Sequence, residues 1–417
     1  MTSIEAPRQT PPASTHPLAV VLHSRQPLTT DLTAVFPVEQ WDTVVLTDAD
    51  AEAVMREDAP GPPPRVHRAP HTAWADVIRD VAGTRPVQIV TNDEYCLLTC
   101  AELRRELGLT ARHPACPERY IDKVVMKERL DAAGIRVPRF LAIPDDGARE
   151  FETVYGEILA RLGLPAVAKP RREANSRGVS ILRTEAELRD WLSEHRGESG
   201  WQVEEFLDGT FHHVNSLVTE GTTTPVQTGS YLGPLLDLPA GRRLGGWTVA
   251  HDSTLARRAQ DLNRAVVAAL GGEGAFVVHT EFAVIGEDEM VVVEVAARAP
   301  GALVSELARL HAGLNLEEVN LALQAELLAP EPEFTGVLAA WVWVPVMPGE
   351  RYRNTPRMRS EQVVHVRQAA RKTHTDTEGA LGVSALLWTT DSSALAADVE
   401  IAATAEWCAQ EDRVDPR

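Results

Sequence analysis

Cysteine is scarce in this sequence, whose 417 residues include only Cys96, Cys100, Cys116 and Cys408. Cys96 and Cys100 could share one face of a helix, but no second pair and no matching histidine spacing completes a zinc site. We interpret the four side chains as buried or incidental thiols. Free thiols of this kind are typical of a reducing compartment, so we expect a cytoplasmic protein.

Long apolar runs and an excess of positive charge are missing as well. No stretch approaches the length that a transmembrane helix needs. The N-terminal segment MTSIEAPRQTPPASTHP lacks the apolar core of a secretory signal, and we expect a flexible tail there. The 41 lysines and arginines against 60 aspartates and glutamates give a net charge of −19. This balance argues against nucleic acid and anionic membranes as partners, since both attract basic surfaces.

The composition that remains, 44% hydrophobic and 24% charged, is ordinary for a globular protein of several domains. The runs HPLAVVLHS, DTVVLTD and PVQIVTN predict three strands, and LLTCAELRRELGL predicts an amphipathic helix after them. The prolines of APGPPPRVHRAP predict a loop. Because strands alternate with a helix, we expect a parallel α/β lobe that ends near residue 115.

The middle of the chain mixes helices with further strands. The segment DKVVMKERLDAAG predicts a helix from Lys123 to Ala133 that Gly134 ends. LPAVAKPRREANSRGVSIL predicts a strand, a polar loop and a second strand, and WQVEEFLDG predicts another strand. LARRAQDLNRAVVAALGG predicts a helix that ends at Gly271. After residue 332, three apolar runs and a closing helix predict a small α+β subdomain.

Two carboxylates stand inside apolar strands in EFAVIGEDEMVVVEVAARAPG. The runs before and after the polar turn GEDE predict a β-hairpin that carries Glu281 on one strand and Glu294 on the other. Neighbouring carboxylates repel each other unless a cation lies between them, and hard oxygen ligands suit Mg²⁺. The alternative is a solvated sheet face with two unrelated acids.

The motifs DKVVMK, AVAKP, VEEFLDG, HTEFAVI and VEVAARAPG occur in this order between residues 85 and 330. In order and spacing they resemble the ATP-grasp superfamily, and within it the carboxylate–amine ligases that make dipeptides and modify natural products. The resemblance implies an α/β fold with a parallel pre-ATP-grasp lobe, a lid subdomain, a catalytic core and the small C-terminal subdomain. The corresponding ranges are 1–115, 116–205, 206–331 and 332–417.

The resemblance also implies which residues bind ATP phosphates. Lys169, at the end of an apolar strand, and Lys123 match the two phosphate-binding lysines of the family. We expect Lys127, one helical turn after Lys123, on a solvated face. The loop that contains Ser176 and Gly178 would cover the phosphates as a lid, although it has fewer glycines than is usual in the family.

The motif VEEFL matches the hinge that reads adenine in the family. The resemblance implies that backbone groups there pair with the base edge, and that the Glu204 side chain accepts from the amino group of adenine. Many relatives place a ribose-binding acid where this sequence has Phe211; His213 or Asn215 could substitute for it. The residues expected at the hinge are Glu204, Glu205 and Leu207.

The resemblance gives the carboxylate pair a role as well. Glu281 and Glu294 match the metal-binding acids, which hold one or two Mg²⁺ ions that bridge the ATP phosphates. The family often has asparagine where this chain has Ala296, which weakens a second metal site. Arg298 is expected on the acyl-phosphate intermediate, since a guanidinium donates a fork of hydrogen bonds. The alternative is a structural ion pair of Arg298 with Glu306.

The implied activity is ATP-dependent ligation of a carboxylate, an amino acid or a peptide, to an amine through an acyl phosphate, with release of ADP and phosphate. The long loop from Gly229 to Trp247 is expected to recognise the substrate, with Arg242 and Arg243 as candidates to hold its carboxylate. A carrier protein could supply a thiol acceptor, and we expect a homodimer in natural-product biosynthesis. The alternatives are a bicarbonate-dependent carboxylase and a nucleotide-binding protein without catalysis.

Overall fold

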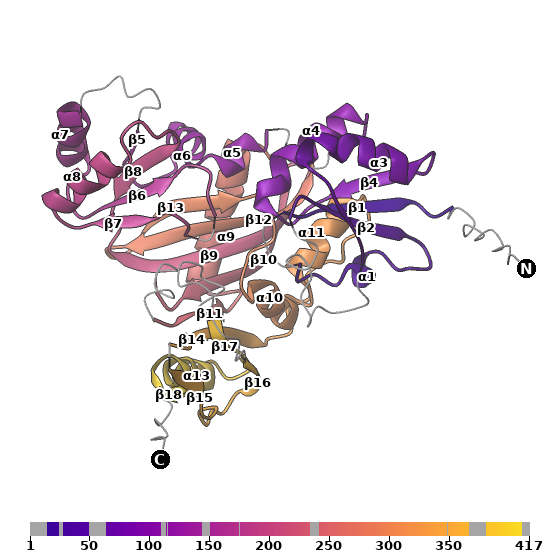
Figure 1. Ribbon diagram of the computed structural model, residues 1–417. Coiled ribbons are helices and arrows are strands. Elements are labelled where there is room, and N and C mark those ends of the chain that lie inside the picture. The colour runs from indigo at the N-terminus through magenta and orange to yellow at the C-terminus, as the bar shows by residue number, and fades with distance from the viewer. Residues whose placement is uncertain are drawn as a thin grey trace, which may run out of the picture. The chain divides into compact units, whose positions relative to one another are not determined.

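The fold is taken from a computed structural model, which divides into two compact units, Met1–Thr110 and Ala111–Arg417 (Figure 1). Each unit is described by itself. In the described residues, every helix is too short or too polar to cross a membrane. The residues that the structure describes are 15–24, 28–49, 64–109, 114, 116–143, 151–174, 176–233, 242–347, 349–366 and 381–410.

The first unit is built on a four-stranded parallel sheet with the strand order β3-β2-β1-β4. Trp74 and Ile78 pack with Leu103 against its strands to form the core. The parallel α/β lobe that the sequence predicts is therefore confirmed. Its elements are β1 (Leu18–Leu22), α1 (Leu32–Val35), β2 (Asp42–Thr47), β3 (Arg65–Arg68), η1 (His71–Ala73), α3 (Trp74–Ala82), β4 (Val87–Val90), η2 (Glu94–Cys96) and α4 (Leu97–Glu106).

The strand β3 lies inside the stretch that the prolines predict to be a loop, so this part of the prediction is wrong. Arg65–Arg68 pairs in parallel with β2 at the edge of the sheet. None of its four side chains is fully buried, so the strand carries little of the apolar pattern by which strands are recognised. Backbone pairing with β2, rather than side-chain burial, makes it a strand.

The second unit contains a small antiparallel sheet of strand order β5-β8-β6-β7, which we name the lid sheet. Two helices pack on it: Ile158 of one and Leu188 of the other share a core with Ala168 and Val203 of the strands. Thr184 and Glu187 form a capping box at the start of the second helix. The elements are β5 (Phe140–Ala142), α7 (Phe151–Arg161), β6 (Ala166–Pro170), β7 (Ser180–Leu182), α8 (Glu185–Glu194) and β8 (Trp201–Glu205).

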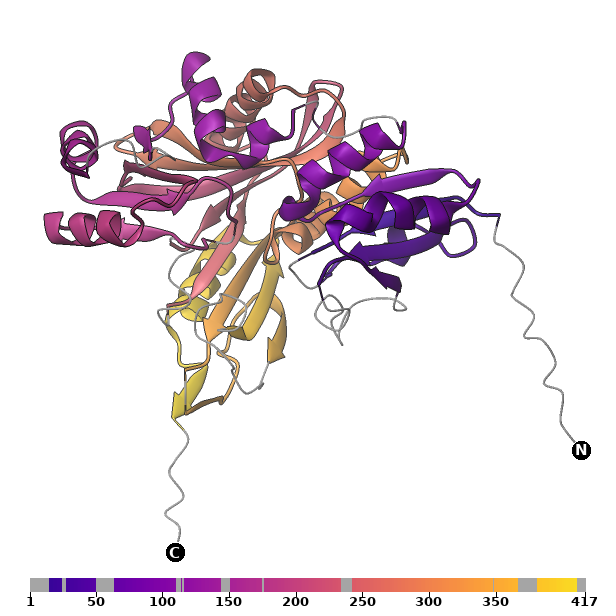
Figure 2. The ribbon, with the colours of Figure 1, turned by 45° about the horizontal axis from the view of Figure 1, so that its top comes forward.

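A large eight-stranded sheet follows, with the order β13-β12-β9-β10-β11-β14-β17-β16 (Figure 2). The last three of these strands come from the C-terminal part of the chain, which joins the sheet by pairing β14 with β11. The strands are β9 (Gly209–Thr219), β10 (Thr222–Tyr231), β11 (Leu244–Val249), β12 (Ala275–Ile285), β13 (Glu289–Ala296), β14 (Leu338–Pro345), β16 (Glu361–Val366) and β17 (Leu381–Thr389). A two-stranded sheet pairs β15 (Glu350–Tyr352) with β18 (Cys408–Gln410).

Helices cover both faces of the large sheet. Phe276 and Val278 of β12 pack with residues of α9 (Thr254–Leu270), whereas the alternating Ala275 and Val277 pack with α10 (Val304–Ala312) and α11 (Leu316–Gln324). Glu281 continues the second series, so it lies on the face opposite α9. The remaining helices of the unit are α5 (Glu118–Ile121), α6 (Lys123–Ala132) and α13 (Ser392–Thr404).

Most long elements follow the prediction, and the loop expected from Gly229 to Trp247 does not. Gly229–Tyr231 belongs to β10 and Leu244–Trp247 to β11, so the irregular part is shorter than expected. The glycines Gly245 and Gly246 suggest a loop in the sequence, but they occur in a strand because neighbouring side chains, such as Leu232 and Trp341, fill the space beside them. Residues 234–241 lie outside the described residues.

Candidate functional site

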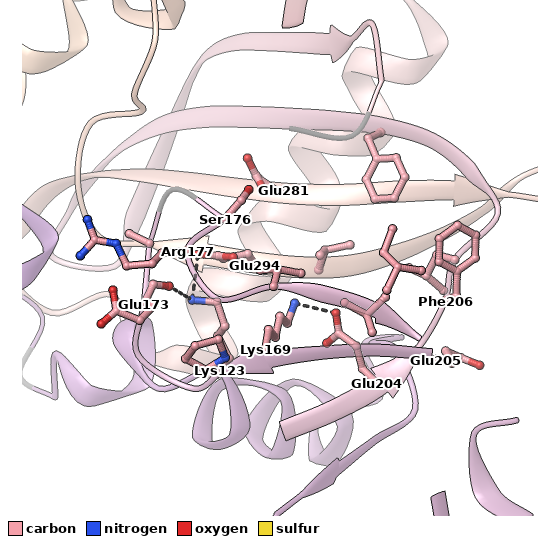
Figure 3. A pocket seen from close by; sticks show the side chains of 18 of the residues that line it. Lys123, Lys169, Glu173, Ser176, Arg177, Glu204, Glu205, Phe206, Glu281 and Glu294 are labelled. Atoms are coloured by element: carbon pink, nitrogen blue, oxygen red, sulfur yellow. Dashed lines mark hydrogen bonds and ion pairs between the residues drawn. The ribbon is translucent and has the colours of Figure 1, made fainter. Parts of the chain in front are cut away.

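A pocket lies between the lid sheet and the large sheet of the second unit (Figure 3). With the solvent at its mouth included, it holds about 1040 Å³ of empty space. Eight of the sequence-predicted residues line it together. These are Lys123, Lys169, Ser176, Glu204, Glu205, Leu207, Glu281 and Glu294.

The two carboxylates of the hairpin stand directly opposite each other in the pocket. Glu281 of β12 pairs with Glu294 of β13, as the hairpin prediction requires. The next pair along the ladder joins Phe282 with Val292, so Val293 is an extra residue in a β-bulge. The bulge brings Val293 and Glu294, which are consecutive, into the lining of the same pocket. Strict alternation would send one of them to the other face.

Glu281 is held by two side chains that the sequence analysis did not select. The Tyr231 hydroxyl donates to Glu281 Oε1 at 2.9 Å, and His279 Nε2 lies 3.2 Å from the same oxygen. His279 Nδ1 in turn lies 2.7 Å from Asn215 Oδ1. Burial alone raises the pKa of Glu281, but His279 and Tyr231 outweigh it and hold the pKa well below its ordinary value. The carboxyl is therefore ionised and fixed in orientation.

Glu294 is paired with a lysine from another element. Lys123 Nζ lies 3.1 Å from Glu294 Oε1 and donates to the Glu173 carbonyl at 2.7 Å (Figure 3). Lys123 is the first residue of α6, whose N-cap Asp122 accepts from the backbone N–H groups of Val124 and Val125. Lys123 therefore connects the pocket-covering loop to the carboxylate pair.

Lys169 and Lys127 share one buried carboxylate. Lys169 Nζ lies 2.6 Å from Glu204 Oε1, and Lys127 pairs with the other oxygen of Glu204 and donates to Gln202 Oε1 at 3.0 Å. The expected solvated position of Lys127 is wrong: its side chain is 0% exposed, and burial lowers its pKa to about 8. The sequence around Lys127 does not indicate this burial, because its partner Glu204 lies 77 residues further along the chain.

Glu204 therefore has a structural role, as partner of two lysines, that the sequence analysis did not include. Burial raises the pKa of Glu204, but the charges of Lys127 and Lys169 outweigh it, so the pKa lies below its ordinary value. Each oxygen has a lysine partner, and the expected contact of this side chain with adenine stays a prediction. Phe206 and Leu207, the next residues of the motif, follow the end of β8 and line the pocket. The Glu205 carboxylate forms ion pairs with Arg136 and Arg139, each with an N···O distance of 2.6 Å.

Ser176 and Gly178 take different positions in the loop between β6 and β7. Ser176 lines the pocket, with a φ of 57°. Gly178 is not among the lining residues, and its φ is +71°. A Cβ there would meet Pro170 Cγ at 2.9 Å. Gly178 therefore shapes the turn of the loop, and the expectation that it contacts the nucleotide through the lining of this pocket is not met.

His213, Arg298 and Arg243 lie outside the lining of this pocket. His213 is 0% exposed and contacts Asn215 through Nδ1, and burial lowers its pKa to about 3. It is therefore a neutral core histidine, and the expected ribose contact is wrong for this arrangement. Arg243 donates to the carbonyls of Ala402 and Ala405 at the end of α13 rather than to a free carboxylate site.

Arg298 lies close enough to Tyr231 for its charge to act on that hydroxyl, and it donates to the Ala299 carbonyl at 2.8 Å. The alternative partner, Glu306, has its two oxygens engaged by Arg309 and Asn315, each at 2.8 Å. Arg298 therefore stands near the tyrosine that holds Glu281.

The donor set fits Mg²⁺ only together with a further ligand. In the part of the chain that the structure describes, no three acid, histidine or cysteine side chains form a metal cluster by themselves. Two opposed carboxylates are the protein ligands that Mg²⁺ usually takes beside substrate phosphates. The lysines Lys123 and Lys169 in the same pocket provide the positive charge that such phosphates need. The residues thus fit a magnesium–nucleotide complex better than a free ion.

Comparisons with known proteins give partial relatives by sequence. No protein-family model matches the chain. It is 32% identical over 150 residues to an N5-carboxyaminoimidazole ribonucleotide synthase of Synechococcus elongatus, covering 34% of this chain and 36% of that protein. It is 34% identical over 90 residues to a D-alanine–D-alanine ligase of Carboxydothermus hydrogenoformans, covering 21% of this chain and 29% of the ligase. The chain thus spans only about a third of the length of these relatives.

Solved structures match over nearly the whole chain. An L-amino acid ligase from Bacillus licheniformis has a TM-score of 0.67 at 18% identity and covers 92% of this chain and 96% of its own. An N5-carboxyaminoimidazole synthetase from Staphylococcus aureus, complexed with ADP, has a TM-score of 0.67 at 13% identity, with 93% and 97% covered. These matches confirm the predicted fold: the chain has the ATP-grasp fold.

Proposed function

We propose that this protein is an ATP-dependent ligase that joins a carboxylate, an amino acid or a peptide, to an amine and releases ADP and phosphate. The observation that carries the proposal is the pairing of Glu281 with Glu294 in one pocket with Lys123 and Lys169. Opposed acids beside lysines suit a metal-bound polyphosphate. The similarity to an L-amino acid ligase structure and to D-alanine–D-alanine ligases supports the choice of substrates.

In this proposal each group acts by position and charge. Lys123 and Lys169 bind nucleotide phosphates, and the backbone from Glu204 to Leu207 meets the edge of adenine. Glu281 and Glu294 hold Mg²⁺, which when bound supplies charge neutralisation on the phosphates. Arg298 stabilises the negative charge of the acyl phosphate.

The reaction needs no nucleophile from the protein. An oxygen of the substrate carboxylate attacks the γ-phosphorus of ATP, and ADP leaves. The amine then attacks the acyl carbon, and phosphate leaves with the former carboxylate oxygen. The lid sheet, which contributes Lys169 and the hinge, would exclude water from the acyl phosphate. Positioning of this kind is the main contribution of proteins to phosphoryl transfer.

A carboxylase that uses bicarbonate is the second candidate. It is favoured by the similarity to an N5-carboxyaminoimidazole ribonucleotide synthase in sequence and to such synthetases in structure. Bicarbonate is itself a carboxylic acid that ATP can activate, so the same carboxylates and lysines serve both reactions. The two candidates differ only in the acid that is phosphorylated. A nucleotide-binding protein without catalysis is the remaining alternative.

The test follows the products of ATP. Purified protein is mixed with Mg²⁺, ATP and one pool of amino acids at a time, and ADP, AMP and phosphate are measured. We expect ADP and phosphate to appear together with particular pools and amide products to form in equal amounts. A parallel series replaces the pools with bicarbonate.

Each result separates the candidates. Turnover with bicarbonate alone would favour the carboxylase, and formation of AMP would contradict an acyl-phosphate mechanism. Tight binding of ATP without turnover on amino acids or bicarbonate would favour the protein without catalysis. Glu289→Gln serves as the activity control, because Glu289 lies on the same strand as Glu294 but is not part of the pocket lining.

A further inference from the structure

Two phenylalanines line the part of the pocket nearest the hinge. Phe206 follows directly on β8 and is 38% exposed, and Phe211 lies near the start of β9. Val167, Leu207 and Val293 complete an apolar wall. A large aromatic side chain exposed inside a pocket indicates that a flat or apolar part of a ligand covers it.

The register of the large sheet places Phe211 relative to the carboxylate pair. Phe211 pairs with Ala283 and His213 pairs with Glu281, so Phe211 is the diagonal neighbour of Glu281 on adjacent strands. Such neighbours lie about 7–8 Å apart on the same face. A nucleotide with phosphates at Glu281 and its base at the hinge must therefore lay its sugar along Phe211.

The carboxylates of the hinge side are already engaged. Glu204 has one oxygen on Lys169 and the other on Lys127. The oxygens of Glu205 are bound to Arg136 and to Arg139, the latter through both its side chain and its backbone N–H. Each oxygen of the two acids thus already has a cationic partner; Figure 3 shows the contact of Lys169 with Glu204.

The other polar groups of the pocket come from the carboxylate hairpin, the start of α6, the end of β10, or β6 and the loop after it, which carries Glu173, Ser176 and Arg177. Glu281 and Glu294 form the opposed pair, Lys123 contacts Glu294, and the Tyr231 hydroxyl donates to Glu281. Among the described residues that line the pocket, the sugar position is therefore bordered by aromatic and aliphatic side chains rather than by a free acid or amide.

We propose that Phe211 makes the site indifferent to the 2′-hydroxyl of the nucleotide, so that the protein binds and uses 2′-deoxy-ATP about as well as ATP. This inference rests on the proposed function, because it assumes that the pocket binds ATP. A carboxylate that accepts from a ribose hydroxyl would favour ATP by roughly tenfold or more. An apolar wall gives no such preference, and the sugar is held by packing alone.

The test compares the dissociation constants of ATP and 2′-deoxy-ATP by calorimetry on the full chain with Mg²⁺. We expect the two constants to agree within about threefold for the wild type, since no charged hydrogen bond is lost. Phe211→Glu should create a preference for ATP of roughly tenfold, because it places an acceptor beside the sugar. Phe211→Met, which keeps the wall apolar, should leave the ratio unchanged.

The ratio of the two constants is the readout, because added negative charge in Phe211→Glu weakens both nucleotides through their phosphates. A wild-type preference for ATP of about tenfold or more would overturn the inference. A folded Phe211→Glu variant that binds both nucleotides with the wild-type ratio would overturn the position of Phe211 at the sugar. Failure of the wild type to bind either nucleotide would instead overturn the proposed function, and the inference with it.

Discussion

Glu204 neutralises two ammonium groups that are themselves buried, and its replacement by glutamine tests the electrostatics of the site. Lys127 is 0% exposed, Lys169 is 7% exposed, and the carboxylate between them is 6% exposed. Glu204→Gln keeps the shape of the side chain but leaves two positive charges without a counter-charge. Removing one partner of a buried ion pair costs roughly 3–5 kcal/mol, so we expect the variant to lose about that much free energy of unfolding at neutral pH.

The loss of free energy of unfolding in the variant should depend on pH, and the pKa of Lys127 determines the direction of this dependence. In the wild type the pKa of Lys127 is already lowered by burial to about 8; without the negative charge of Glu204 it falls further. The unfolded chain of the variant then binds more protons than the folded one, so its stability rises with pH. The difference in free energy of unfolding between wild type and variant should decrease as the pH rises towards about 8. Above this pH Lys127 is deprotonated in both folded proteins.

The assay is urea denaturation of wild type and variant at about pH 6 and at about pH 8, followed by tryptophan fluorescence. The matched control is Glu205→Gln on the next residue, since the side chains of Arg136 and Arg139 are 35% and 59% exposed and stay solvated without it. Ion pairs of that kind contribute about 0–1 kcal/mol. The reasoning would be refuted if both variants lost the same free energy of unfolding. It would also be refuted if the difference between wild type and Glu204→Gln did not change with pH.

Three further outcomes are expected. Glu294→Gln should abolish Mg²⁺-dependent ATP turnover without changing the circular dichroism spectrum; normal turnover would remove this residue from the metal site. Tyr231→Phe should weaken Mg²⁺ affinity in the presence of nucleotide by roughly 10–100-fold, because a metal ligand loses its supporting donor; an unchanged Mg²⁺ titration would contradict this. Gly178→Ala should cost roughly 1–2 kcal/mol more than Gly286→Ala, because both have positive φ but only Gly178 faces Pro170; equal melting temperatures would contradict it.

The sequence predicts those parts of the fold in which local pattern and tertiary contact agree. Helix α6 begins at Lys123 as expected, and α9 ends at Gly271, which has a φ of 97°. The hairpin of Glu281 and Glu294 is paired as predicted. In each case the signal lies within a few residues of the element, where capping, turn chemistry and alternation act.

The parts that the sequence could not predict depend on residues far apart in the chain. From the sequence alone Lys127 is indistinguishable from a surface lysine in a helix, because its partner Glu204 lies far along the chain. Tyr231 cannot be recognised as a support of Glu281 until β10 is placed beside the carboxylate, which lies 50 residues further along the chain. The bulge at Val293 follows from how two strands pair, and a run of valines does not specify it. Pairing across the chain, rather than local propensity, decides these features.

The pairing of β14 with β11 has a consequence for the edges of the large sheet. If the chain ended before Leu338, the N–H and C=O groups of β11 would lose their partners along Leu244–Trp247. This edge contains two glycines and no charged side chain, so little would oppose pairing with another molecule. The C-terminal strands therefore protect β11 from pairing with other molecules. The exposed edge at this end of the sheet is instead β16, which begins with a glutamate and is only six residues long.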